Sequence, residues 1–319
     1  MLGSPEISIR PLEERDLDEA DRIVRLAFGT FLRIPEPAKV FGDREMLRNR
    51  WRASPSSGFA AVMGRELVGS IMATRWGRFG FFGPLTVRPD LWDKGIASKL
   101  LRPTMELFSN WRTTHRSLFT FAESPKHVGL YHKFGFHARF LTPVMSKQVD
   151  PQKRAKTETY RKFSALKEDG RLQALSACWE LTNEIYGGLD LTSEILAVAN
   201  QRLGDTLVAM DGSAVSGFAV CHVGPRTEAG GGNCYVKFGA ARLGSGSRRD
   251  FAGLLQACES FAIERGADRL EAGVNLGRRE AYEVMLERGF RTEFQGVVMD
   301  NPNEAGYNRP DVYVIDDLR

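Results

Sequence analysis

The two halves of this chain repeat one order of expected helices and strands, and this constrains the fold more than any other feature. Residues 130–140 read LYHKFGFHARF, and residues 284–294 read VMLERGFRTEF. In both segments a helical pattern runs into a Gly-Phe corner, and a strand pattern follows. A repeated element order of this length indicates two duplicated domains. Convergence on a common helix-Gly-Phe ending is the alternative explanation.

Hydrophobic periodicity predicts the elements of both halves. In the first half we expect strands at 7–10, 58–62, 66–76, 81–87 and 116–122, helices at 16–31, 38–51, 95–109 and 125–134, and a closing strand pair within 136–145. In the second half we expect helices at 170–186, 192–203, 249–265 and 278–288 and strands at 205–210, 214–223, 233–241, 269–274 and 292–299.

The predicted fold class is therefore mixed α/β (α+β), with two tandem domains at 1–148 and 149–319. Each domain is expected to be a twisted mixed sheet flanked by helices. The length of 319 residues agrees with this division, because one domain typically takes roughly 100–200 residues.

Composition limits the environment of the protein. No run approaches the roughly 18 apolar residues of a membrane span, and the first residues lack the apolar region of a secretory signal. We therefore expect a cytoplasmic protein without a membrane partner. The four cysteines form no Cys-x-x-Cys pair and have no histidine at metal-ligand spacing, which predicts small buried side chains and no metal.

Charge gives little reason to expect a nucleic-acid partner. The net charge is +4, and the densest basic run, at 147–167, lies between the two halves and also carries the acids Asp150 and Glu158. We interpret this run as a solvated linker and helix start. A phosphate-binding patch is the alternative.

The segment 81–101 predicts an anion site, because a strand, a loop and a helix follow one another there. Helix N-termini present unpaired N–H groups and partial positive charge, which bind anions. Gly95 and Ala97 let a phosphate approach the backbone, and Ser98 adds a hydroxyl donor. A glycine at a helix start also occurs in many such units that bind no ligand.

The wider pattern resembles motif A of the GNAT superfamily of N-acetyltransferases. That motif is a strand ending in Val-x-Pro, followed by (Gln/Arg)-x-x-Gly-x-(Gly/Ala) at a helix start. Here Val87-Arg88-Pro89 is followed by Trp92-Asp93-Lys94-Gly95-Ile96-Ala97, with Trp92 in place of Gln or Arg. Residues 124–136, SPKHVGLYHKFGF, resemble motif B of the same family, with its Leu-Tyr-x-x-x-Gly-Phe ending.

The resemblance implies an enzyme that transfers an acetyl group from acetyl-CoA, its co-substrate, to a primary amine by direct attack. Tyr131 matches the family tyrosine that protonates the departing thiolate. The pantetheine arm would pair with the strand at 85–87, where the Val87 N–H would polarise the thioester carbonyl. The residues implied in coenzyme binding are Leu85, Thr86, Val87, Trp92, Asp93, Lys94, Gly95, Ile96, Ala97 and Ser98.

The attacking amine must lose a proton, so a general base is expected near Tyr131. Glu123, at the end of its strand, is the first candidate and His127 is the second. A carboxylate at this place also serves as a partner of the helix dipole, which is the structural alternative for Glu123.

The second half looks like a degenerate copy. Aligning Leu254-Leu255 with Leu100-Leu101 places Arg249 opposite Gly95 and Met285 opposite Tyr131. We expect this half to shape the acceptor cleft, and binding of a nucleotide or a second CoA is the alternative.

The acceptor is expected to be a small-molecule or peptide amine, selected by loops at 30–48 and 76–79. A non-catalytic acyl-CoA-binding or regulatory protein is the alternative to an enzyme. The sequence does not decide whether the protein forms a homodimer.

Overall fold

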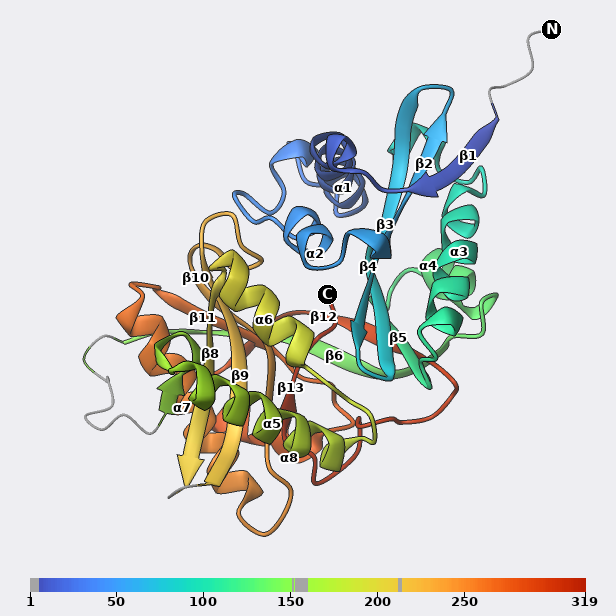
Figure 1. The fold of residues 1–319 in the computed structure, drawn as a ribbon. Coiled ribbons are helices and arrows are strands. Elements are labelled where there is room, and N and C mark those ends of the chain that lie inside the picture. The colour runs from blue at the N-terminus through green and yellow to red at the C-terminus, as the bar shows by residue number, and fades with distance from the viewer. Residues whose placement is uncertain (1–5, 151, 153–159, 212–213) are drawn as a thin grey trace, which may run out of the picture.

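A single mixed sheet runs through the whole molecule. The computed structural model describes residues 6–150, 152, 160–211 and 214–319. The strand order within these residues is β1-β2-β3-β4-β5-β12-β6-β11-β10-β9-β8-β7, and a short strand β13 pairs with β10 (Figure 1). Both halves therefore contribute to one mixed α+β sheet, as the sequence predicted for each half.

The first half follows the predicted order closely. Its elements are β1 (Ile7–Pro11), α1 (Leu17–Phe31), α2 (Leu47–Ala53), β2 (Gly58–Met63), β3 (Glu66–Trp76), β4 (Phe79–Val87), α3 (Ile96–Asn110), β5 (His115–Thr120), α4 (Pro125–His132) and β6 (His137–Gln148).

The second half repeats the pattern and adds two short strands that periodicity did not indicate. Its elements are β7 (Tyr160–Lys162), α5 (Glu168–Ile185), α6 (Thr192–Gln201), β8 (Gly204–Asp211), β9 (Ala214–Gly224), β10 (Gly230–Ala241), α7 (Ser247–Glu264), β11 (Arg269–Gly273), α8 (Arg279–Glu287), β12 (Arg291–Asn301) and β13 (Val314–Ile315).

Two of the predicted elements differ in the structure. The helix expected at 38–51 is confined to α2, because Phe41 and Gly42 have left-handed backbones (φ 72° and 55°) that a right-handed helix excludes. The closing strand pair expected at 136–145 is the single long strand β6, which has no turn within it and pairs with neighbours along both edges.

The last long strand of each half, β6 and β12, lies beside strands of the other half. β12 pairs with β5 of the first half, with Val297 opposite Thr120. β6 pairs with β11 of the second half, with Ser146 opposite Glu271. The two exchanged strands also pair with each other and join the halves into one sheet. The domain boundary between residues 148 and 149 stays a prediction.

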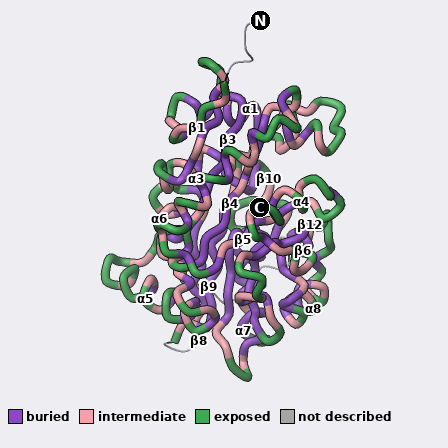
Figure 2. Tube along the Cα trace, turned by 90° about the vertical axis from the view of Figure 1, so that its right-hand side faces the viewer, coloured by how far each residue is buried: buried purple, intermediate pink, exposed green. Residues whose placement is uncertain are grey.

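Aromatic and charged side chains pack at the interface between the two halves. Trp76 of β3 contacts Phe238 of β10 edge to face at 5.3 Å, and both are fully buried. Arg50 of α2 forms a buried ion pair with Glu228 (Nη2–Oε2 2.7 Å), and Lys237 binds the same carboxylate at 2.7 Å. Figure 2 shows the buried residues continuing along the central strands through both halves.

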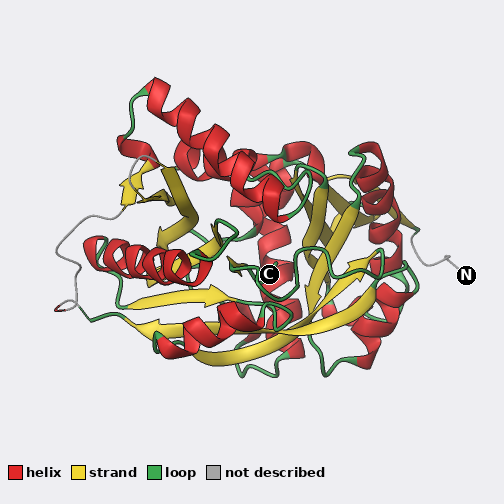
Figure 3. Ribbon diagram, turned by 90° about the horizontal axis from the view of Figure 1, so that it is seen from below, coloured by secondary structure: helices red, strands yellow, loops and turns green. Residues whose placement is uncertain are grey.

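Helices lie on both faces of the sheet (Figure 3). α3 packs on β2, β3 and β4, whereas α7 packs on β8, β9 and β10. The cysteines Cys178, Cys221, Cys234 and Cys258 are buried in these layers with free thiols, as predicted. Across the described ranges, no helix has the length and apolar character of a membrane span.

Candidate active site

The first half of the sheet splits open between β4 and β5. The two strands pair in parallel as far as Phe82 opposite Leu118. β5 pairs with β12 along its other edge, and beyond this point the strand that still flanks residues 83–87 of β4, among the described residues, is β3. The far edge of residues 83–87 therefore faces a gap in the sheet.

Backbone groups of Val87 face this gap. The Arg88 N–H donates to the Val68 carbonyl of β3 at 2.8 Å. Because hydrogen-bond directions alternate along an antiparallel strand, the N–H and C=O of Val87 point away from β3. The indole Nε1 of Trp92 donates to that carbonyl at 2.8 Å, which leaves the Val87 N–H as the donor on this edge.

The loop after β4 turns sharply into α3. Asp93 and Gly95 have left-handed backbones (φ 65° and 74°), and Gly95 caps a helix that begins at Ile96. A Cβ at Gly95 would meet nothing within 4 Å, so the space above the helix N-terminus is open. Trp92 is a structural element here: besides its bond to β4, its ring lies 5.5 Å from the Lys126 ammonium, which pairs with Asp93 at 2.6 Å.

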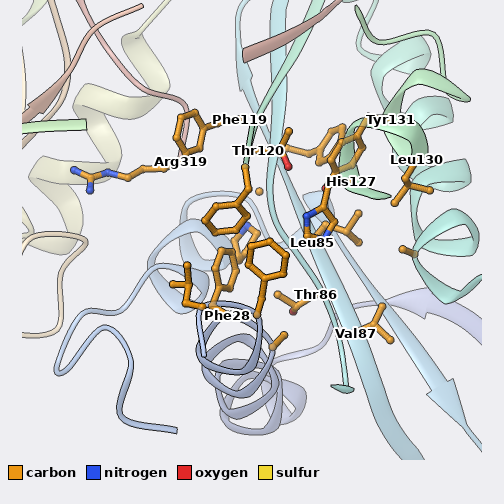
Figure 4. Close-up of a pocket in the computed structure, with 18 of the residues that line it drawn as sticks. Phe28, Leu85, Thr86, Val87, Phe119, Thr120, His127, Leu130, Tyr131 and Arg319 are labelled. Atoms are coloured by element: carbon orange, nitrogen blue, oxygen red, sulfur yellow. The ribbon is translucent and has the colours of Figure 1, made fainter. Parts of the chain in front are cut away.

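One cavity of about 780 Å³ joins the gap, the loop and the catalytic candidates. It is lined by all the sequence-predicted residues except Lys94, whose side chain is exposed. In Figure 4, His127 and Tyr131 lie near Leu85, and the side chain of Arg319 extends away from them. The predicted lining residues are Leu85, Thr86, Val87, Trp92, Asp93, Gly95, Ile96, Ala97, Ser98, Glu123, His127 and Tyr131.

Tyr131 is held in the wall of the cavity by α4. Its ring packs against Phe82 of β4 at 5.7 Å, and it is 7% exposed. Burial raises the pKa of Tyr131, and a hydrogen bond with Thr120 partly opposes this shift. The phenol is therefore protonated at neutral pH and can donate a proton.

His127 and Glu123 occupy different environments. The His127 ring is 5.0 Å from the Phe31 ring, and its Nδ1 is buried with no hydrogen-bond partner among the described residues. Burial lowers the pKa of His127, the Lys126 charge lowers it further, and the Glu123 charge opposes both. Glu123 lies in the turn after β5 and is exposed at the cavity edge.

The second half contains an equivalent split, which its own chain fills. β10 and β11 pair in parallel as far as Val236 opposite Ala272. Beyond it, β13 enters the gap and pairs with β10, with Ile315 opposite Gly239. Counting from the last paired residue, Ala241 corresponds to Val87. The Ala241 N–H donates to the Tyr313 carbonyl at 3.0 Å.

Buried polar contacts hold β13 and the residues after it in this gap. Arg278, 0% exposed, binds the Asp316 carboxylate at 2.7 Å and the Val314 carbonyl at 3.0 Å. The segment after β13 passes close to Gly273. A larger residue would not fit there, because its Cβ would lie 2.3 Å from the Cβ of Asp317. The chain then continues to Leu318 and Arg319, which line the cavity of the first half.

The start of α7 is displaced relative to the start of α3, and the glycine before it has a right-handed backbone (φ −89°), unlike Gly95. Gly246, not Arg249, caps α7 as Gly95 caps α3, because α7 begins three residues earlier relative to its leucine pair. Arg249 instead pairs with Asp250 at 2.8 Å. Met285, the predicted counterpart of Tyr131, is fully buried in the core.

The cavity has an aromatic lining, most of which was not predicted from the sequence. Phe28, Phe31, Phe41, Phe119, Phe121 and Phe294 line it, together with Glu228 and Tyr235 of the second half. Phe31 and Phe41 belong to the segment at 30–48 that the sequence singled out, and its role in selecting an acceptor stays a prediction. The hairpin at 76–79 does not line the cavity, because Trp76 and Phe79 are buried where the halves meet. The phenylalanine-rich composition was visible, but which rings converge depends on the exchanged strand β12.

Comparisons with known proteins agree with this geometry. Residues 22–136 match the model of the Acetyltransferase (GNAT) family. A putative acetyltransferase from Pyrococcus horikoshii has a similar structure, with TM-score 0.69, 16% identity and coverage of 96% of this chain and 93% of that one. A GCN5-related N-acetyltransferase from Sphaerobacter thermophilus gives TM-score 0.60 at 15% identity, covering 92% and 95%.

A tandem GNAT protein from the clavulanic acid biosynthesis pathway also matches, with TM-score 0.60, 14% identity and coverage of 92% and 98%. No curated protein sequence matches this chain. Residues 22–136 therefore form a domain that matches the GNAT family, and the whole chain has the fold of a tandem GNAT protein. Membership of this family indicates acyl-CoA-dependent acyl transfer.

Proposed function

We propose that this chain is an N-acetyltransferase that uses acetyl-CoA as co-substrate, acetylates a primary amine and holds the coenzyme in its first half. The observation that carries the proposal is the shared cavity. It brings the free edge of β4, the open helix N-terminus at Gly95 and the side chains of Tyr131 and His127 together.

The binding residues fit the coenzyme. An extended pantetheine arm carries amide groups that can pair with a strand edge, and residues 85–87 offer such an edge. A pyrophosphate needs several N–H donors and positive potential, which the start of α3 supplies. Trp92 supports this loop through its bond to Val87, so its departure from the family pattern leaves the backbone donors in place.

The catalytic roles follow from the two environments described above. The Val87 N–H donates to the thioester carbonyl as negative charge develops on its oxygen. His127 is neutral at pH 7 because its pKa is lowered, so it can accept the proton of the attacking amine. Tyr131 stays protonated and donates to the leaving thiolate. Glu123 attracts the cationic amine from its exposed position at the cavity edge.

The first experiment measures binding by thermal unfolding and titration calorimetry with acetyl-CoA. At a ligand concentration of 100 times Kd, binding should stabilise the folded protein by about 2.7 kcal/mol. Calorimetry should give one coenzyme per chain, because β13 occupies the second gap. No stabilisation at millimolar acetyl-CoA would overturn the proposal.

The second experiment separates an enzyme from a non-catalytic acyl-CoA-binding protein. Steady-state thiol release is measured with acetyl-CoA and a panel of amines, and His127→Gln serves as the test variant. We expect thiol release that depends on the amine. In a pH–rate profile, the wild type should lose activity at low pH, and the variant should lack this decrease. Coenzyme binding with no amine-dependent thiol release would support the binding protein instead.

A further inference from the structure

The acceptor side of the cavity is an aromatic enclosure. α1 contributes Phe28 and Phe31, and the residue after β5 is Phe121, whose ring lies 4.6 Å from Phe31 and 6.0 Å from Phe28. Phe31 also contacts the ring of His127 at 5.0 Å. The aromatic surface therefore reaches the nitrogen base directly, without an intervening polar side chain.

The exchanged strand completes this enclosure from the second half. Phe294 of β12 lies 6.2 Å from Phe119 of β5, ring centre to ring centre, and both line the cavity. Phe294 is 43% exposed, so its ring presents apolar surface at the cavity. The rings thus come from both halves and border one space.

The cationic side chains that line the cavity are already neutralised. Arg44 binds both oxygens of Glu271, at 3.0 and 2.5 Å. Arg319 pairs with Glu271 and Asp317, each at 3.3 Å, and Lys126 pairs with Asp93 as described above. A carboxylate or phosphate on the acceptor would therefore lose its water without gaining a free cation, which is costly.

The remaining lining charge is negative. Glu228 is neutralised by Arg50 and Lys237, which outweigh burial and hold its pKa below the ordinary range. Glu123 is the lining acid that has no ion pair among the described residues, and it lies four positions from His127. The cavity therefore presents one free negative charge beside the base, at the edge of an apolar enclosure.

We propose, on the basis of the acetyltransferase function above, that the acceptor is an arylalkylamine: a primary amine on a short chain attached to an uncharged aromatic ring. The ring occupies the phenylalanine enclosure, where aromatic pairs gain energy beyond area burial. The ammonium approaches Glu123 and passes its proton to His127. The amine lone pair then forms the amide bond as the thioester bond breaks, and Tyr131 protonates the leaving thiolate.

The test compares kcat/KM for phenethylamine, phenylalanine and ethanolamine with acetyl-CoA. Phenylalanine adds only a carboxylate to phenethylamine, and ethanolamine lacks the ring. We expect phenethylamine to exceed each of the others by at least about tenfold. Equal or better turnover of ethanolamine or phenylalanine overturns the inference and leaves the acetyltransferase function intact.

Variants test the enclosure itself. Phe31→Ala and Phe294→Ala should each raise KM for phenethylamine several-fold more than KM for ethanolamine. Phe140→Ala is the matched control, because Phe140 lies on β6, half-buried, and does not line the cavity. If both variants instead impair octanoyl-CoA as donor and leave phenethylamine unchanged, the enclosure holds an acyl chain and the inference is wrong.

A binding measurement keeps the inference testable even if turnover is slow. With saturating CoA present, phenethylamine should raise the unfolding temperature further, and ethanolamine should not. Stabilisation by CoA alone, with no added effect of phenethylamine, rejects the aromatic acceptor. Absence of stabilisation by CoA itself rejects the acetyltransferase function.

Discussion

The sheet contains two gaps of the same geometry, one in each half. The first is open to the cavity, and the second is filled by a strand. In each, two parallel strands pair for four residues and then diverge. The first gap, between β4 and β5, opens into the cavity with the Val87 N–H on its edge. The second gap, between β10 and β11, holds β13, and the equivalent N–H of Ala241 binds Tyr313.

This difference explains how a duplicated fold can retain one ligand site. A gap between diverging strands leaves backbone donors and acceptors that must be satisfied. In the second half a segment of the chain itself satisfies them, anchored by Arg278 and Asp316. In the first half no strand among the described residues fills the gap, and we propose that the coenzyme pairs with this edge instead. After β13 the chain continues to Leu318 and Arg319, which line the cavity of the first half. The second half therefore contributes to this cavity.

The largest expected effect comes from disturbing the filled gap. Arg278→Met removes the cation from a pair whose side chains are 0% and 2% exposed. Because Asp316 would remain buried without its partner, we expect a loss of about 3–5 kcal/mol in the free energy of unfolding, measured by urea denaturation. Adding Asp316→Leu should restore most of the loss. An unchanged stability of the single variant would show that this anchor does not hold β13.

The next effect concerns Tyr131, the proposed proton donor, which was aligned with Met285 in the second half. Tyr131→Phe should lower kcat by about 10²–10⁴-fold, because the leaving thiolate loses its proton source. Calorimetry should show little change in acetyl-CoA affinity. Met285→Leu, at the matching place on α8, is the control and should leave kcat unchanged. Equal turnover of the Tyr131 variant and the wild type would remove the tyrosine from the mechanism.

A smaller effect is expected at the helix start beside the open gap. Gly95→Val places a side chain in the free space above α3 and should weaken acetyl-CoA binding at least about tenfold. Gly64→Val is the control, since Gly64 has a similar left-handed backbone (φ 64°) and open surroundings in the β2–β3 turn. Both variants should lose roughly 1–3 kcal/mol of stability from backbone strain. Similar coenzyme affinity in both variants would contradict the phosphate role of Gly95.

The smallest effect tests the charge at the edge of the open gap. Activity should fall as pH decreases through the lowered pKa of His127, because the protonated ring cannot accept a proton. Glu123 raises that pKa, so Glu123→Gln should move the acid limb of kcat to lower pH. A pH–rate profile measures this directly. A limb that moves to higher pH, or stays in place, would show that another group controls the profile.

Much of the first half could be predicted because local patterns determine it. Proline after β4, glycine at the start of α3 and the Leu-Tyr-x-x-x-Gly-Phe ending of α4 each act within a few residues. From these features we predicted the coenzyme-facing residues, and nearly all of them line one cavity in the structure. Lys94 is the exception, since its side chain is exposed at the loop. The basic residues Lys153, Arg154 and Lys156 of the predicted linker lie outside the described residues.

The sequence by itself determined the two-fold repeat of elements, the glycine at the start of α3 and the tyrosine of the first half. These depend on periodicity, backbone conformation and short spacings, which are local. Only the tertiary structure decided that β6 and β12 exchange places, that β13 fills the second gap and that Phe294 reaches the cavity of the first half. These contacts join residues far apart in the chain, and strand pairing between distant segments leaves no periodic signal in either one.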